Sequence, residues 1–276
     1  MDYLQITFEQ ADEAQQEILI ALLSEQGAEG FEETGKGLKA FFPPGSIAEQ
    51  ELAPLLQPFG IPYTVAGVAQ QNWNQQWEEH FQPVRIGDFC QIRAHFHPVG
   101  AAVQHDIIIT PKMSFGTGHH ATTRLMAEQM ATLPFKDARV FDFGTGTGVL
   151  AILAEQLGAG SVLAIDNDEW SFNNATENIG MNHCRHIQLQ QATLEAINNP
   201  APFDIILANI NRHILLAGMT RMAELLTDGG ILLMSGLLQE DAPMVSAAAS
   251  AAGLGQIAVI SGNAGWIGIR CSKGLI

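Results

Sequence analysis

Hydrophobic positions in the first 68 residues follow the spacing of strands and helices in turn. Leu4, Ile6 and Phe8 alternate with polar residues, which predicts a strand. Residues 12–26 carry apolar side chains on one helical face, and Gly27 suits the left-handed position that ends many helices. Further strands are predicted near 29–33, 38–42 and 63–68, with a helix over 47–56. The order strand, helix, strand, strand, helix, strand is typical of a small ferredoxin-like α+β domain.

From residue 138 the pattern changes to apolar strands that alternate with amphipathic helices. Strands are predicted over 140–143, 161–165, 186–190, 204–208, 230–235, 256–261 and 266–270, and helices over 149–157, 169–179, 214–226 and 239–252. Two further strands, 87–94 and 105–110, lead into this region. The alternation predicts an α/β fold with a largely parallel sheet and helices on both faces. Such sheets bind ligands beyond the carboxyl ends of their strands, so we expect a site there.

An aromatic stripe separates the two regions. Trp73, Trp77 and Phe81 recur every four residues, so they share one face of a predicted helix. The stripe either packs two domains together or contacts a substrate, and the sequence does not distinguish these roles. We therefore divide the chain into a small α+β domain (1–69), a Trp-containing helical linker (70–82) and a larger α/β domain (83–276).

The composition predicts a folded, acidic protein. Apolar residues make up 47% of the chain, which allows a sizeable core, so disorder over most of the length is not expected. Thirteen Lys and Arg residues face 29 Asp and Glu residues, a formal net charge of −16. Such a surface repels phosphate backbones and attracts basic proteins, so we expect a basic protein partner and no direct nucleic-acid binding. Acidity also aids solubility in itself, and the charge does not separate the two explanations.

The cysteines and the N-terminal sequence concern the location of the protein. Cys90, Cys184 and Cys271 are odd in number and lack metal-ligand spacing, which fits a reducing cytoplasm. The first residues lack a basic segment followed by an apolar stretch. No apolar run approaches the roughly 20 residues that span a bilayer. We expect a soluble cytoplasmic protein without membrane contact.

A glycine-rich loop follows the strand over 140–143. The run Asp142-Phe143-Gly144-Thr145-Gly146-Thr147-Gly148 lets a ligand lie against the backbone, and the next helix offers free N–H groups. A dinucleotide-binding loop would have its third glycine at the position of Val149, so the spacing here differs from that pattern. A tight turn that binds no ligand would also use glycines. Asp166 ends the next strand, where a carboxylate accepts hydrogen bonds from ribose hydroxyls. Of Asp166 and Asp168, one is expected to cap the following helix. Loop, helix, strand and carboxylate together predict an adenosine-containing cofactor.

The spacing of this loop, with an acidic residue at its start, resembles motif one of the Rossmann-like class I methyltransferases. Three more segments resemble the ribosomal protein L11 methyltransferase family. They are Phe81-Gln82-Pro83, Ala208-Asn209-Ile210-Asn211 and Met113-Ser114-Phe115-Gly116-Thr117-Gly118-His119-His120-Ala121-Thr122-Thr123. The resemblance covers essentially the whole chain. It implies methyl transfer from S-adenosylmethionine, which leaves S-adenosylhomocysteine, to lysine side chains and the N-terminal amine of a basic large-subunit ribosomal protein.

The resemblance also implies site residues. The expected cofactor-binding residues are Thr123, Gly144, Asp166, Asn209, Phe115, Thr117, Asp142 and Gly146. Of these, Phe115 and Thr117 lie in a segment expected to close over the methionine end of the cofactor, and Asp142 either holds the loop or touches the ligand. Asn209 is also the expected catalytic residue, because its carbonyl can accept a hydrogen bond from an amine, although a turn that ends a strand would use Asn as well. The chain departs from the family pattern at Lys112, His119, Ala121 and Asn211.

No metal site is expected. His119 and His120 are adjacent, so they would not share one helical face, and no third ligand stands at suitable spacing. Their expected role is in loop structure or substrate contact. The small N-terminal domain is assigned to substrate recognition, and a monomer is expected because such a domain needs a free face.

Other functions stay open on the sequence alone. A class I methyltransferase could act on another protein amine, a glutamine amide or a small molecule, although the segment at Asn209 lacks the two prolines usual in amide and nucleobase N-methyltransferases. A nicotinamide oxidoreductase is disfavoured by Val149. A non-catalytic binding protein could keep the fold, but the loop, Asp166, Asn209 and the Thr122-Thr123 pair together disfavour it.

Overall fold

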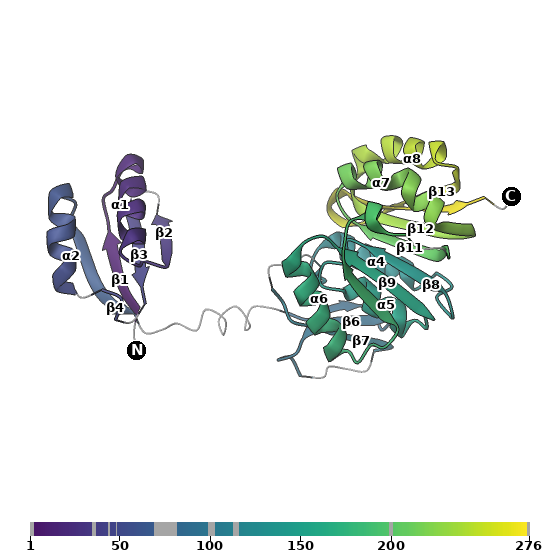
Figure 1. Ribbon diagram of the computed structural model, residues 1–276, viewed down its shortest axis with the longest axis horizontal. Helices are drawn as coiled ribbons and strands as arrows, with labels where there is room; N and C mark the ends of the chain where they lie inside the picture. The colour runs from purple at the N-terminus through teal and green to yellow at the C-terminus, as the bar shows by residue number, and fades with distance from the viewer. Residues whose placement is uncertain are drawn as a thin grey trace. The chain divides into compact units, whose positions relative to one another are not determined.

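The structure is a computed structural model that describes residues 3–34, 37–43, 45–47, 49–68, 82–98, 103–112, 116–198 and 201–274 of the 276-residue chain. The chain forms two compact units, Met1–His80 and Phe81–Ile276 (Figure 1). The aromatic stripe Trp73, Trp77 and Phe81 lies outside the described residues. The division into two domains and a helical linker therefore stays a prediction.

The first unit has a four-stranded antiparallel sheet with the order β2-β3-β1-β4. Its elements follow the predicted succession: β1 (Tyr3–Phe8), α1 (Glu13–Glu25), β2 (Gly30–Thr34), β3 (Gly37–Phe42), α2 (Glu49–Leu56), a 3-10 turn (Gln57–Phe59) and β4 (Tyr63–Val68). Ile6 and Phe8 of β1 are buried with Leu19 and Leu23 of α1. The two-residue strand period places both β1 side chains on one face of the sheet.

The second unit begins with a three-stranded sheet, β5 (Val84–Ile86), β6 (Cys90–Ala94) and β7 (His105–Ile109), in which β6 and β7 run parallel. The single strand predicted over 87–94 is wrong at its start. A turn that includes Gly87, with φ of +53°, separates β5 from β6. Glycine adopts this left-handed conformation at little cost, so Gly87 was the available signal for a turn within the predicted strand.

The large sheet of the second unit has the strand order β10-β9-β8-β11-β12-β14-β13. Its elements are β8 (Arg139–Phe143), α5 (Val149–Gln156), β9 (Ser161–Asp166), α6 (Glu169–Met181), β10 (Ile187–Gln191), β11 (Phe203–Asn209), α7 (Arg212–Leu225), β12 (Leu226–Leu238), α8 (Ala242–Ala251), β13 (Leu254–Ser261) and β14 (Trp266–Lys273). The first five strands in the sheet order are parallel, and β14 runs antiparallel to both of its neighbours. The predicted α/β fold is confirmed.

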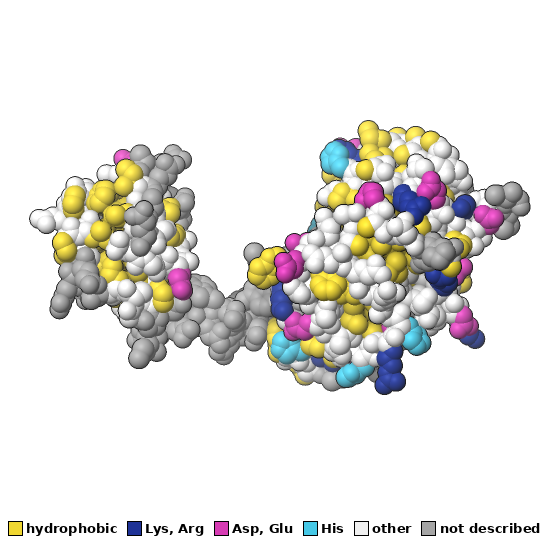
Figure 2. Space-filling view, in the orientation of Figure 1, with side chains coloured by type: hydrophobic (Ala, Val, Ile, Leu, Met, Phe, Trp, Pro, Cys, Tyr) yellow, Lys and Arg dark blue, Asp and Glu magenta, His cyan; other side chains and the backbone are white. Residues whose placement is uncertain are grey.

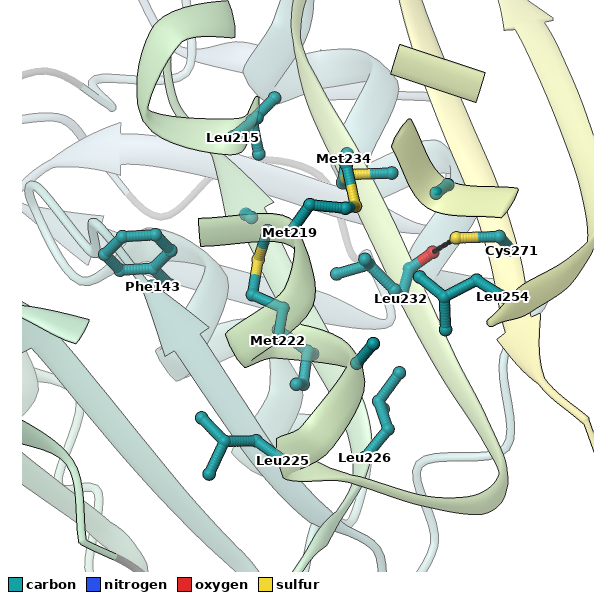
Figure 3. Close-up of a cluster of buried hydrophobic side chains, with 14 of the residues drawn as sticks. Phe143, Leu215, Met219, Met222, Leu225, Leu226, Leu232, Met234, Leu254 and Cys271 are labelled. Carbon is teal, nitrogen blue, oxygen red and sulfur yellow. Dashed lines mark hydrogen bonds between the residues drawn. The ribbon is translucent and has the colours of Figure 1, made fainter. Parts of the chain in front are cut away.

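Helices cover both faces of this sheet, with α4 (Ala121–Met130), α5 and α6 on one side and α7 and α8 on the other (Figure 1). Successive residues of a strand pack into the cores on opposite faces of the sheet, because strand side chains alternate between the two faces. Val140 packs with α4 and α5, whereas the next residue, Phe141, packs with α7 and α8. Figure 3 shows side chains of the second core, among them Met219 and Met222 of α7 and Met234 of β12. Burial on both faces holds the strand ends in fixed positions.

Helix α4 (Ala121–Met130) was not identified from the sequence. Its N-cap is His120, whose ring nitrogen accepts the N–H of Thr122. Histidine is not among the usual capping residues, so the ordinary start signal is missing. Leu125 and Met126 of α4 are buried, and this apolar spacing was the available signal.

Candidate active site

Three strand ends of the large sheet meet around a cavity of about 780 Å³. Phe143 ends β8, Asp166 ends β9 and Asn209 ends β11, and all three line this cavity. The site therefore lies where the parallel topology predicts it. Four of the sequence-predicted residues line the cavity together: Gly144, Gly146, Asp166 and Asn209.

The glycine loop passes close to other parts of the backbone. Gly144, Gly146 and Gly148 have φ values of +73°, +56° and +82°, which L side chains rarely adopt. A Cβ atom on Gly144 would lie 2.3 Å from Cγ2 of Ile210. The N–H groups of Gly144 and Thr145 both donate to the carbonyl of Ile165, at 3.0 and 2.9 Å. The loop is thus bound to β9 and leaves no room for a side chain at Gly144.

Asp166 connects the glycine loop to the end of β9. One carboxylate oxygen accepts the N–H of Gly146 at 2.9 Å, and the other accepts the N–H of Asp168 at 3.1 Å. Each oxygen keeps further acceptor capacity, since a carboxylate has about four lone-pair sites. Asp168 caps α6 by accepting the N–H of Ser171 at 2.8 Å. This resolves the alternative left open by the sequence: Asp168 is the helix cap, and Asp166 faces the cavity.

Asp142 lies beneath the loop and is 1% exposed. The hydroxyl of Thr145 donates to its carboxylate at 2.5 Å. The pKa of Asp142 is raised to about 7, chiefly by burial and also by the nearby charge of Asp166, while the Thr145 hydrogen bond acts in the opposite direction. Asp142 does not line the cavity formed by the described residues. Its position favours the loop-holding role over ligand contact.

Asn209 has one satisfied and one unsatisfied side-chain group. Its side-chain NH₂ donates to the hydroxyl of Thr123 at 3.5 Å, which joins β11 to the first turn of α4. Its side-chain oxygen is buried and has no hydrogen-bond partner among the described residues. Buried amide oxygens are seldom left without a partner, so this atom is a candidate for contact with a ligand. Thr123 itself is fully buried behind the cavity wall.

The segment before α4 contributes less clearly to the site. Phe115 lies outside the described residues, so its predicted role is not addressed by the structure. The hydroxyl of Thr117 is 3.3 Å from Nδ1 of His119, and neither residue lines the described cavity. His120 does line it, and its ring packs edge-on against Trp266 with ring centroids 4.7 Å apart.

Sequence reasoning missed several cavity residues. Trp266 starts β14, and its Cα is paired with Leu238 at the end of β12. Because β14 is antiparallel, its first residue lies at the same edge of the sheet as the carboxyl ends of its parallel neighbours. Glu195 follows β10 by four positions and lies in the 3-10 turn Leu194–Ala196. Ile210 and Ile214 supply apolar wall, and their place after β11 was the available signal.

Charge near the cavity is acidic. Asp166 and Glu195 line it, and no Lys or Arg is among its described lining residues. The N–H of Glu195 itself and the hydroxyl of Thr193 lower the pKa of the exposed Glu195 carboxyl, so it stays ionised at neutral pH. Elsewhere on the second unit, charged side chains of both signs are scattered over the face shown in Figure 2.

The described residues include no group of three or more His, Cys, Asp or Glu side chains placed to hold a metal ion. Over the same part of the chain, none of the helices has the length and apolar character needed to cross a membrane.

Known proteins resemble this chain over most of its length. A family model described as ribosomal protein L11 methyltransferase matches residues 5–274. The ribosomal protein L11 methyltransferase of Porphyromonas gingivalis is 41% identical over 244 residues, which cover 86% of this chain and 84% of that protein. The one from Chlorobaculum parvum is 39% identical over 256 residues, covering 88% and 87%.

A solved structure gives the same result, and a second one shares the fold. The crystal structure of a ribosomal protein L11 methylase from Lactobacillus delbrueckii subsp. bulgaricus superposes with a TM-score of 0.64 at 31% identity, covering 70% of this chain and 100% of that one. A methyltransferase from Pyrococcus furiosus superposes with a TM-score of 0.51 at 16% identity, covering 61% and 90%, and shows a shared fold only.

Proposed function

The chain belongs to the ribosomal protein L11 methyltransferase family, and on that premise we propose that it transfers methyl groups from S-adenosylmethionine to amino groups of ribosomal protein L11. The acceptors are lysine side chains and the N-terminal amine. The observation that carries the proposal is the buried side-chain oxygen of Asn209, which lacks a described partner and belongs to a residue that lines the cavity beside the glycine loop.

The residues around the cavity fit an adenosine-containing ligand. Asp166 retains acceptor capacity for ribose hydroxyls after binding two backbone N–H groups. Gly144 and Gly146 let the ligand approach the backbone, and Ile210 and Ile214 offer apolar surface for a flat base. Thr123 supports Asn209 from behind. When bound, S-adenosylmethionine supplies a methyl group activated by its neighbouring sulfonium.

We assign Asn209 the task of orienting the attacking amine. Its side-chain oxygen accepts an N–H of the amine, which aligns the nitrogen lone pair with the methyl group and keeps water away. The attacking amine must be neutral, because a protonated nitrogen has no free lone pair. An ordinary lysine, with a pKa of about 10.4, is protonated at neutral pH, and removal from water lowers that pKa. An amide is too weak a base to take the proton, so the proton leaves to solvent.

His120 is tied to the start of α4 and lines the cavity. Its Nδ1 lies 2.7 Å from the hydroxyl of Thr122, and the backbone N–H of Thr122 donates to the same nitrogen at 3.3 Å. These contacts fix the orientation of the ring. Its contact with Trp266 gives the cavity an aromatic wall, which suits the hydrocarbon part of a lysine side chain.

The charge of the chain supports a basic substrate. The net charge of −16 favours encounter with a basic protein, and the lining of the cavity carries Asp166 and Glu195. The same charge disfavours direct binding of nucleic acid. The first unit, with its own core, is assigned to recognition of the substrate protein.

The alternative is a methyltransferase of this fold that acts on another amine, an amide or a small molecule. Incubation of the full chain with methyl-labelled S-adenosylmethionine and the separated proteins of an unmodified large ribosomal subunit distinguishes the two. The proposal predicts label on L11, located by peptide mapping at lysine and N-terminal nitrogens. Label on a different protein, or on glutamine, would refute the substrate assignment.

A further inference from the structure

Asparagine side chains on one face of α6 bind the backbone at the end of β7. Asn182 accepts the N–H of Ile108 at 2.9 Å and donates to its carbonyl at 2.6 Å. Asn178 accepts the N–H of Thr110 at 2.7 Å, and Asn174 donates to the Thr110 carbonyl at 3.0 Å. The four-residue spacing of Asn178 and Asn182 along the helix matches the two-residue spacing of Thr110 and Ile108 along the strand. Four helical residues rise about 6 Å, and two strand residues about 6.6 Å.

Of these three asparagines, Asn178 also binds the glycine loop. Its side-chain NH₂ donates to the carbonyl of Thr147 at 2.8 Å, and both residues are fully buried. The hydroxyl of Thr147 in turn donates to the carbonyl of Gly116 at 2.7 Å. Asn178 therefore links the residue after β7 to the glycine loop, and Thr147 links the loop to Gly116 in the segment before α4.

The loop is held from two sides. Asp166 accepts the N–H of Gly146, and Asn178 binds the carbonyl of the next residue, Thr147. Gly146 and Gly148, on either side of Thr147, have positive φ, and glycine has wide conformational freedom. Fixing the Thr147 carbonyl therefore restricts a segment that would otherwise sample many arrangements.

We infer that Asn178 is a positioning residue for cofactor binding, which acts by fixing the glycine loop through Thr147. It does not line the cavity, so its effect reaches the ligand through the loop. The inference rests on the proposed function, since it assumes that the cofactor binds at this loop.

Calorimetric titration of the full chain with S-adenosylhomocysteine tests it by comparing Asn178→Ala with Asn182→Ala. Both variants lose hydrogen bonds to the backbone at the end of β7, and among the described residues Asn182 has no hydrogen bond to the glycine loop. We expect Asn178→Ala to raise the dissociation constant by roughly tenfold and Asn182→Ala to change it by less than about twofold. Equal dissociation constants, with melting temperatures lowered in both variants, would overturn the inference.

Hydrogen exchange of the ligand-free chain separates this inference from the proposed function. Amides of residues 145–148 should exchange faster in Asn178→Ala than in Asn182→Ala, whether or not the wild-type chain binds the ligand. Equal exchange would overturn the positioning role. Failure of the wild-type chain to bind would instead refute the proposed function.

A second pair of variants covers the case in which Asn178→Ala does not fold. Asn178→Asp and Asn182→Asp each keep an acceptor for a backbone N–H, of Thr110 and Ile108, and lose the NH₂ that donates to Thr147 and Ile108, respectively. Asn178→Asp should bind S-adenosylhomocysteine more weakly than Asn182→Asp by a factor of about five or more. Equal binding by both would overturn the positioning role of Asn178.

Discussion

The side-chain amide of Asn209 donates to the hydroxyl of Thr123, a residue 86 positions earlier in the chain, and its carbonyl oxygen is buried without a described partner. The end of β11 carries this amide, and the first turn of α4 orients it through the hydrogen bond to Thr123. An amide held in this way can serve an incoming amine without first reorganising, which is the advantage of a preorganised site.

Asn209→Ala should lower kcat by roughly a hundredfold, because it removes the group assigned to orient the amine. Thr123→Val is the matched variant, since it removes the support and leaves the amide oxygen. It should lower kcat by about tenfold or less. Single-turnover kinetics at saturating cofactor measure both. Near-normal turnover of Asn209→Ala in a folded protein would contradict its assignment.

Asp166→Asn should weaken binding of S-adenosylhomocysteine by roughly 10- to 100-fold, because hydrogen bonds to a charged acceptor contribute about 1.5–3 kcal/mol. The substitution also places an NH₂ group against the N–H of Gly146 or Asp168. Asp168→Asn is the control, since Asn caps helices as well as Asp does. Titration calorimetry should show little change for the control. Equal affinities of the two variants would refute the role of Asp166.

Gly144→Ala should destabilise the second unit and abolish detectable cofactor binding. The new Cβ would meet Ile210 Cγ2 at 2.3 Å, and φ there is +73°. Gly253→Ala is matched in backbone strain, with φ of +83°, but no atom lies within 4 Å of its Cβ. Gly253→Ala should lower the free energy of unfolding by about 1 kcal/mol and leave cofactor binding intact. Thermal melts and titrations compare them, and intact binding by Gly144→Ala would contradict the close packing at the loop.

The buried Asp142 should make stability fall as pH rises toward neutrality. Burial raises its pKa to about 7, whereas the unfolded chain has the ordinary value of 3.8. The folded protein therefore binds the proton more tightly, and this contribution to stability is present below about pH 4 and lost as pH rises through about 7.

Asp142→Asn removes that titration. Between about pH 5 and pH 8, the melting temperature of the wild-type chain should fall relative to that of the variant. The fall should be roughly 2–4 °C for each kcal/mol of stability lost through the titration of Asp142. Glu177 and Asp241, whose pKa values are lowered by hydrogen bonds, lose their protons below this range and do not obscure the comparison. Parallel curves for the two proteins would contradict the raised pKa.

Much of the large sheet was predictable because strands buried on both faces are continuous apolar runs. Val140 and Phe141 illustrate this, since each packs in a different core. The alternation of strands and helices then fixed the edge of the sheet at which Gly144, Asp166 and Asn209 meet. Local pattern and topology agree in this region.

The features that were missed depend on contacts between distant segments. His120 caps α4 with a ring nitrogen, which no capping rule anticipates. Trp266 reaches the cavity because β14 runs antiparallel to β12, and a single sequence does not give strand direction. The link from Asn178 to Thr147 joins residues 31 positions apart and follows from packing of α6 on the loop.

The most direct test of the proposed function is intact-mass spectrometry of purified, unmodified ribosomal protein L11 incubated with the full chain and S-adenosylmethionine. The proposal predicts mass gains in steps of about 14 Da, which are lost when the amines of L11 are acetylated beforehand. No gain with a wild-type chain shown to bind S-adenosylhomocysteine, or an undiminished gain on acetylated L11, would contradict methyl transfer to its amino groups.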